Sequence, residues 1–600
     1  MPNALNLPDA PAVPGGVPTW LEPLNTAEQR LWEAFPHGDT VVYASGAAEV
    51  DDPSNGTDWG PERTIRASVI AALALGASKA EPGRTAGVRI VGARIVGQLE
   101  LRHGIVDVPL TLRRCRVEGT IRVDEAVTRS IDLTGSHIGR VRAEGARVRG
   151  SLKLADAVVE IPSGAAVSGS GGGSEGAGSS TGEEVYALSS TPRTSARFEE
   201  GLLHLDEITI DTDLSAPRLR CAGTVSLIGA NIGAVLDLYE AQISRPLRVS
   251  LNLGGAQIGR QLLAGRAVFK GQVRMPSASC GGVVHFSRAS ITEAAGTALT
   301  AEGFTSAGDG YFQHGFHAVG GVALIGTRFG GVLSFRGAHL GPAQAWPVLH
   351  CGGMQVSRGL YLNDGFRAEG EVRLVGATIG GHLDITGMAK DSGPLTLYHA
   401  SVATIRDGGP KTWPRELMLD GLTYNAFDPY LPAKERLTLL RRQRHGYRAQ
   451  PYEFMAAYYR ELGHDEDARA VLLEKERARR STDRFRERIL GRLFDVSVGY
   501  GYRPMRAVVY GALIQIAASI FFFIDPPSQI RPEDHVAFYP VLYAADVFVP
   551  IVHFGQSDAF QSHGFAAVVT TVLPYLGWAL GLSIVAGASR TLTRGFADRQ

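Results

Sequence analysis

Apolar residues recur every ten or eleven positions along the chain, from about Val88 to Ile405. Apolar and polar residues alternate locally, as in Leu152-Lys153-Leu154, which is the spacing of a strand. One column of this register consists of Leu99, Leu110, Ile121, Ile131, Val141 and Leu152. Such a period is typical of a solenoid, in which each unit buries its apolar side only by stacking on its neighbours. The pattern predicts a mainly β protein with a β-solenoid over residues 86–423, and a right-handed β-helix is expected.

Small and branched residues form further columns beside the first one. The small residues are Cys115, Ala126, Ser136, Ala146 and Ala157, and the branched ones are Val117, Ile138, Val148 and Val159. Two units make one coil of roughly 20–22 residues, a size within the range of β-solenoid repeats. In three later units a glycine precedes the small or polar residue at a predicted corner, namely Gly229, Gly326 and Gly376. We expect sharp turns there, because small residues let the chain turn and stack closely.

Residues 1–85 lack the period and predict a lead-in with two short helices. Thr26 and Gln29 match a capping box before the first helix. Pro61 suits the first turn of the second helix. The apolar stripe of that helix consists of Ile65, Val69, Ile70 and Leu73. The end of a solenoid exposes unpaired strands and apolar core, so we expect the second helix to cover it.

A Gly/Ser-rich stretch at about residues 162–194 predicts a flexible insertion that loops out of one coil. Residues 424–500 have a helical period and predict a helical hairpin with a basic juxtamembrane helix. The expected helices cover 434–444, 451–462 and 465–480, with Gly463 as the break between the last two. This pair is similar to a single tetratricopeptide-type helix pair. One pair is not an array, so we expect it to cap the far end of the solenoid.

Residues 501–600 predict a membrane anchor. The apolar runs 507–524 and 566–588 are long enough to span a hydrocarbon core of about 30 Å. Between them, residues 539–552 are apolar but too short to span, and they contain Asp546 and Pro550. This segment is expected to be interfacial or re-entrant, and the sequence leaves both alternatives open.

Flanking charge predicts the topology. Arginines precede the first run and follow the second, whereas the connecting loop is mainly acidic. The positive-inside rule therefore predicts a multi-pass protein of the cell membrane with the bulk of the chain on the cytoplasmic side. Asp546 is a candidate functional residue because an acid in a membrane segment is costly, and the alternative is that it faces water. Candidate contacts to anionic lipid are Arg484, Arg488, Arg492, Arg503 and Arg506.

Composition and motifs exclude some functions. The formal net charge is zero, so no nucleic-acid partner is expected. The four cysteines, which form no CxxC pair and are expected to be small buried wall residues, are Cys115, Cys221, Cys280 and Cys351. Asp237 and Asp384 recur at equivalent positions, which predicts outward or corner roles, and His314 and His317 form only a weak metal pair. No catalytic constellation, cofactor site or metal site is identifiable.

Two long phrases carry a resemblance to a known group. They are GLYLNDGFRAEGEVRLVGATIGGHLDITG and GVALIGTRFGGVLSFRGAHLG, and the helix pair and two apolar runs follow them. The chain resembles actinobacterial membrane proteins with a pentapeptide-repeat-like β-helix, which often carry the label "membrane-associated oxidoreductase". The segment LYAADVFVPIVHFGQ also resembles the region between the spans of related anchored proteins. The resemblance implies a membrane protein with a large β-helix, and no catalytic residue follows from its label.

The leading hypothesis is a membrane-tethered cytoplasmic scaffold that binds other proteins on its solenoid surface. One alternative, implied by the label alone, is a membrane-associated oxidoreductase, for which a retained nicotinamide or flavin would be the sign. Another is an oligomeric two-span channel or transport component, although no TVGYG-like filter is present. The sequence leaves the oligomeric state open.

Overall fold

The computed structural model describes residues 16–47, 49–160, 202–343, 347–481, 505–531, 536–549 and 551–597. The chain divides into two compact units, Met1–Tyr430 and Leu431–Gln600. The predicted Gly/Ser-rich insertion at 162–194 lies outside the described residues.

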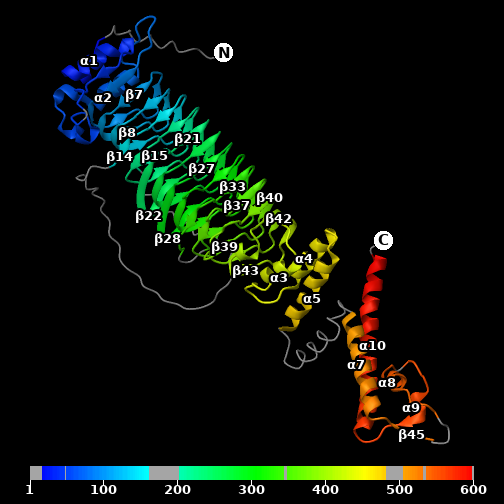
Figure 1. The fold of residues 1–600 in the computed structure, drawn as a ribbon. Coiled ribbons are helices and arrows are strands. Elements are labelled where there is room, and N and C mark those ends of the chain that lie inside the picture. The colour runs from blue at the N-terminus through cyan, green and yellow to red at the C-terminus, as the bar shows by residue number, and fades with distance from the viewer. Residues whose placement is uncertain are drawn as a thin grey trace, which may run out of the picture. The chain divides into compact units, whose positions relative to one another are not determined.

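The first unit is mainly a right-handed β-solenoid of about 13 turns (Figure 1). Each regular coil has four sides, numbered here in chain order, with one short strand on each. In one coil these strands are β3 (Val88–Val91), β4 (Arg94–Val96), β5 (Leu99–Glu100) and β6 (Ile105–Val106). Successive coils pair in parallel, and β7 (Leu110–Arg113) lies on β3. The predicted β-solenoid is therefore confirmed.

Side 1 has one strand in every coil of the solenoid. After β3 and β7 its strands are β10 (Ile131–Asp132), β13 (Leu152–Lys153), β17 (Leu214–Ser215), β21 (Val235–Asp237), β24 (Gln261–Leu263), β27 (Val284–His285), β30 (Gly310–Tyr311), β33 (Val332–Ser334), β37 (Gly359–Tyr361), β40 (Thr378–Asp384), β42 (Ser401–Arg406) and β44 (Thr423–Asp428). The predicted end of the solenoid at residue 423 thus falls on the first residue of its last strand.

The single apolar column read from the sequence belongs to two opposite sides of the coil. Leu110 pairs with Ile131 on side 1, whereas Leu99 pairs with Ile121 on side 3. Both sides carry the same Leu-x-Leu pattern, so the visible repeat is half a coil. The ladder keeps its register across the insertion, because Val141 on side 3 pairs with Leu203.

Corners explain the small-residue column. At each regular corner one residue adopts the left-handed conformation, and the next side chain turns into the core. Gly229, Gly326 and Gly376 have φ of 66°, 64° and 63°, as the sequence predicts for these corners. The small residues of the column are all buried: Cys115, Ala126, Ser136, Ala146 and Ala157.

Phenylalanine side chains fill the C-terminal half of the solenoid interior. They form a stack of neighbouring rings on successive coils: Phe269, Phe286, Phe312, Phe335 and Phe366. Phe312 lies 5.2 Å from Phe286 and 5.3 Å from Phe335 between ring centroids, with both pairs stacked. Buried aromatic rings of this size contribute much of the packing energy of a core.

The N-terminal end is covered by helices, with two corrections to the expected boundaries. Helix α1 (Thr26–Ala34) begins with a capping box of Asn25 and Glu28, one residue before the expected Thr26 and Gln29. Pro61 opens a 3₁₀ turn, and Ile65 belongs to strand β2 (Thr64–Arg66), which pairs with β4.

The second helix, α2 (Ala67–Ala74), begins only after β2, because parallel pairing holds residues 64–66 in extended backbone. Its side chains are almost all buried, and it contacts strands β2, β3 and β5. The helix therefore covers the first coil, as we expected for the second helix of the lead-in.

The second unit begins with α3 (Ala433–Leu440), α4 (Ala449–Glu461) and α5 (Asp465–Ser481). Helices α4 and α5 pack on each other and are joined at Gly463, whose φ is 77°. The helical hairpin thus occupies the predicted residues. Its role as a cap of the solenoid stays a prediction.

The C-terminal module contains α7 (Met505–Ile524), α8 (Pro540–Phe548), α9 (Gln556–Ala559) and α10 (Phe565–Ala597). Strands β45 (Ser528–Gln529) and β46 (Phe560–Gln561) pair in antiparallel fashion. The core between α7, α8 and α10 consists of Ala518, Phe522, Tyr543, Ala544, Val547, Phe548, Phe560, Ala566 and Leu573.

Both predicted apolar runs are helical. Among the described residues, one stretch, Phe565–Leu582 in α10, is long and apolar enough to cross a membrane. The apolar part of α7, Val508–Ile524, is shorter. The prediction of two transmembrane helices is therefore not confirmed by length and composition.

Candidate functional site

Asp546 lies in α8 with its side chain fully buried. Its Oδ1 accepts a hydrogen bond from the backbone N–H of Phe554 at 2.8 Å, and its Oδ2 accepts one from the N–H of Ser557 at 2.7 Å. The Nδ1 atom of His553 is 3.8 Å from Oδ1. The carboxylate therefore fastens the segment after α8 back onto the helix, and the alternative in which it faces water does not hold.

Other polar side chains join the helices of the same module. Gln515, the polar interruption of the first apolar run, donates from Nε2 to the carbonyl of Val541 in α8 at 3.0 Å. The hydroxyls of Tyr543 and Thr570 each lie 3.0 Å from the hydroxyl of Ser562. These contacts link α8 to α7 and to the beginning of α10.

The predicted lipid-contact arginines cannot be placed. Arg484, Arg488, Arg492 and Arg503 lie outside the described residues, and Arg506 lies in the first turn of α7 with its side chain outside the described set. Their role stays a prediction.

A row of outward positions runs along side 1 of the solenoid. The parallel register places one residue per coil in this row: Asp237, Leu263, His285, Tyr311, Ser334, Tyr361 and Asp384. The register confirms that Asp237 and Asp384 occupy equivalent positions in this row, although Asp384 is buried. Neighbouring strands lie about 4.8 Å apart, so consecutive side chains in the row are in contact range.

Four rings and one guanidinium gather here, and we name them the aromatic patch: Tyr239, His285, Tyr311, Arg336 and Tyr361. The rings of His285 and Tyr311 lie 6.1 Å apart, edge to face. The Arg336 guanidinium lies over the Tyr361 ring at 4.4 Å. Tyr239 and His285 flank Gly265, where an added Cβ would lie within 3.3 Å of both. The two rings thus pack closely over Gly265, where a side chain would be crowded.

The charge of the patch is low. Burial lowers the pKa of His285, and its neighbour His314 lowers it further, so the protonated imidazole is disfavoured there. The Tyr311 hydroxyl donates to Asp309 at 2.8 Å, and this bond together with burial raises the pKa of the phenol. The patch therefore combines flat apolar faces with polar edges and one cation, the chemistry enriched at the centres of protein interfaces.

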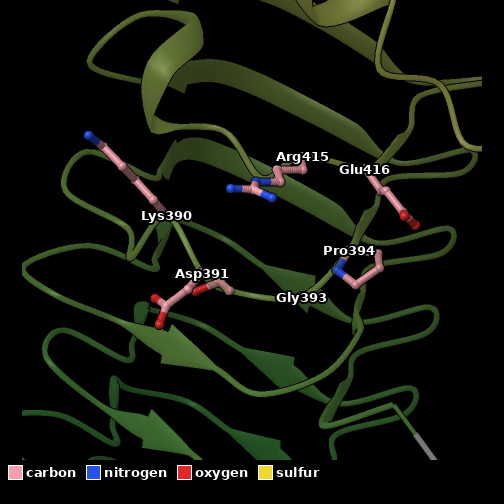
Figure 2. A pocket seen from close by; sticks show the side chains of 7 residues that line it. Lys390, Asp391, Gly393, Pro394, Arg415 and Glu416 are labelled. Atoms are coloured by element: carbon pink, nitrogen blue, oxygen red, sulfur yellow. The ribbon is translucent and has the colours of Figure 1, made fainter.

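A hollow of about 440 Å³ lies at the C-terminal end of the solenoid, and Figure 2 shows the side chains that line it. It is lined by Lys390, Asp391, Ser392, Gly393, Pro394, Arg415 and Glu416. Arg415 extends toward the loop that carries Lys390, whereas Glu416 points away from it (Figure 2). Asp391 is paired with Arg367 at 2.9 Å. The lining contains no His or Cys, its Asp391 is engaged by Arg367, and the Ser392 hydroxyl accepts a hydrogen bond from the backbone N–H of Ala368 at 3.3 Å, so these residues do not form a His- or Cys-based nucleophilic constellation.

Histidines and cysteines do not assemble a reactive centre in the part of the chain that the structure describes. No group of three or more His, Cys, Asp or Glu among those residues could hold a metal ion. Burial raises the pKa of Cys115 and Cys221 to about 12, and it also raises the pKa of Cys280 and Cys351. All four are buried free thiols, as the sequence predicted for wall residues.

Sequence reasoning missed the aromatic patch. Each patch residue lies within or just after a Leu-x-Leu-like stretch of side 1 and next to a buried apolar residue. His285 precedes Phe286, for example, and Tyr311 precedes Phe312. Coil lengths differ, however, so only the strand register shows which of these residues become neighbours.

Comparison of the chain with protein-family models, curated proteins and solved structures finds no match.

Proposed function

We propose that this protein is a membrane-anchored scaffold whose solenoid binds other proteins through the aromatic patch. Helices α7 and α10 cross the membrane, and the solenoid lies on its cytoplasmic side, as the arginine distribution favours. The oxidoreductase and channel alternatives have no specific contact in their favour among the described residues.

The exposed apolar surface of α7 and α10 is the observation that carries the anchor. Large apolar side chains between one third and three quarters exposed cover both helices. They include Val509, Leu513, Ile516, Ile520, Phe523, Val568, Val572, Tyr575, Leu576, Trp578 and Leu582. Contiguous apolar surface of this extent is rare on soluble monomers and marks a membrane or protein contact. The same helices pack on a buried core through their other faces. The exposed side chains are therefore not part of that core.

The regularity of the solenoid supports the scaffold. Parallel register is continuous along side 1 from Val88 to Asp428. A surface built on such a ladder presents its side chains at fixed spacing, and it needs little ordering when a partner binds. The aromatic patch is the part of this surface with the chemistry of a binding centre.

Alkaline carbonate extraction of membranes tests the anchor. We expect the full chain to stay in the membrane fraction and the double variant Leu513→Arg with Val572→Arg, one in each span, to be released, because each arginine costs about 2.5–3.5 kcal/mol at the centre of a span. The matched control carries Ile105→Arg and Leu247→Arg on exposed solenoid positions. Release of the unchanged protein would contradict the anchor.

The size of the detergent-solubilised assembly on native gels tests the binding surface. We expect Tyr311→Ala with Tyr361→Ala to lose the partner and migrate faster, whereas Ile105→Ala with Leu247→Ala should migrate as the unchanged protein does. Equal migration of all three would contradict the role of the patch. A saturable thermal stabilisation by a nicotinamide or flavin, about 2.7 kcal/mol at 100 times Kd, would favour the oxidoreductase alternative instead.

A further inference from the structure

Helix α8 lies beside the middle of α7 rather than beside its end. The Gln515 side chain of α7 contacts the Val541 carbonyl of α8 at 3.0 Å. About one turn closer to the N-terminus of α7, a Cβ added to Gly511 would lie 4.0 Å from the Phe548 ring. At 1.5 Å per residue, Gly511 is about 20 Å from the C-terminal end of α7. A hydrocarbon core is about 30 Å thick, so α8 lies at the depth of acyl chains if α7 spans it.

Four backbone N–H groups of the chain that returns from α8 have partners inside the module. The N–H of Val549 donates to Ala545, and the N–H of Val552 donates to Val549. The N–H groups of Phe554 and Ser557 both donate to the Asp546 carboxylate. Backbone groups at membrane depth need partners inside the protein, because the hydrocarbon core holds no water to hydrogen-bond them. The buried Asp546 carboxylate thus supplies two of these internal acceptors.

Apart from His553, whose side chain is 78 % exposed, the outside of this returning segment is covered by apolar side chains. Val549, Ile551, Val552 and Phe554 are 37, 80, 40 and 50 % exposed. Ile551 is the most exposed large apolar side chain in the described part of the chain. Exposing these side chains to water carries a free-energy cost in proportion to their area.

We propose that α8 and the described residues that follow it, Val549 and 551–555, form a re-entrant hairpin whose apolar side chains are embedded in lipid acyl chains. The occupant of this surface is the bilayer interior, and the inference rests on the proposed membrane anchor. It decides between the two alternatives for residues 539–552 in favour of the re-entrant one. Asp546 then acts as the internal acceptor that lets the chain turn back at this depth.

A fluorescent probe on Ile551→Cys tests the hairpin in the full-length protein, reconstituted in phosphatidylcholine–phosphatidylglycerol vesicles. The four native cysteines are buried and their raised pKa values suppress the reactive thiolate, so a maleimide probe reports the introduced thiol. The probe is quenched separately by acyl-chain spin labels and by aqueous iodide. Val572→Cys in α10 is the lipid reference, and Ile105→Cys on the solenoid is the water reference.

We expect the probe at 551 to follow the lipid reference, with strong acyl-chain quenching and weak iodide quenching. Quenching by iodide to the level of the Ile105→Cys probe would overturn the hairpin in favour of an interfacial segment, while lipid quenching at 572 would keep the anchor. Protection from both quenchers would overturn it too, because the segment would then pack on a second copy or another protein. Iodide quenching at 572 itself would refute the anchor, and the hairpin with it.

Discussion

Replacing Phe312 by Ala should open the solenoid locally. Phe312 is fully buried, stacks between Phe286 and Phe335 at 5.2 and 5.3 Å, and meets the edge of Phe316 at 5.3 Å. Truncating a buried Phe to Ala costs about 3–5 kcal/mol. Each lost aromatic pair adds about 0.5–1.5 kcal/mol beyond the buried area. With three ring partners lost, we expect the upper part of the range, about 4–5 kcal/mol.

The loss should stay within the neighbouring coils. The stability of a solenoid is approximately a sum of repeat stabilities and nearest-neighbour interfaces. Hydrogen exchange measured by mass spectrometry reports this. We expect amide exchange in β27, β30 and β33 to accelerate roughly a thousandfold, since every 1.4 kcal/mol is a factor of ten. Exchange in β7 and β10 should change little.

Tyr311→Ala is the matched control, because it removes a ring from the outer face of the same strand. Tyr311 is partly exposed, so its removal should accelerate exchange much less. Equal acceleration by the two variants would refute the assignment of the stability to the interior stack. Uniform acceleration along the whole solenoid would refute the locality of the effect.

Three further predictions concern single residues. Asp546→Ala leaves two backbone N–H groups without their acceptor, so thermal unfolding in detergent should show a loss of about 2–6 kcal/mol, which exposed Asp558→Ala should not reproduce. Glu28 is buried, which raises its pKa, but hydrogen bonds from Arg66 outweigh burial and lower it below 4.5. Its contribution is therefore complete above pH 4.5 and lost as the pH falls below it, and Glu28→Gln should flatten the acid limb of a Tm–pH curve. At Gly229, where φ is 66° and an added Cβ meets only ordinary contacts, Gly229→Ala should lower the free energy of unfolding by about 1–2 kcal/mol in a denaturant titration.

The solenoid could be predicted from the sequence because its core positions repeat. Leu110 and Leu112 are both buried on one side, and the polar residue between them faces out, so alternation is visible without any structure. Boundaries were less certain where two signals compete. Asn25 and Thr26 are both good capping residues, and only the contact of Glu28 with the backbone of Asn25 decides between them. Ile65 fits the helical stripe, but pairing with Ile95 places it in a strand.

The binding surface was harder to predict because it depends on register over many coils. Tyr311 and Tyr361 lie on side 1, two coils apart, although coils of unequal length separate them in the sequence. No local pattern marks that distance. The partners of Asp546 were hidden for a different reason: they are backbone N–H groups, and such donors leave no signature in side-chain sequence.

Gln515 shows how such a hidden contact changes the interpretation of hydropathy. As an isolated residue it interrupts the apolar run of α7, and its amide is costly in a hydrocarbon environment. In the folded module its Nε2 donates to the Val541 carbonyl of α8, so part of that cost is already offset inside the protein. From hydropathy alone, the Gln515 amide would be expected to face lipid. The hydrogen bond to Val541 shows that it lies between α7 and α8. The short apolar length of α7 is therefore compatible with a span whose polar residue holds α8 in place.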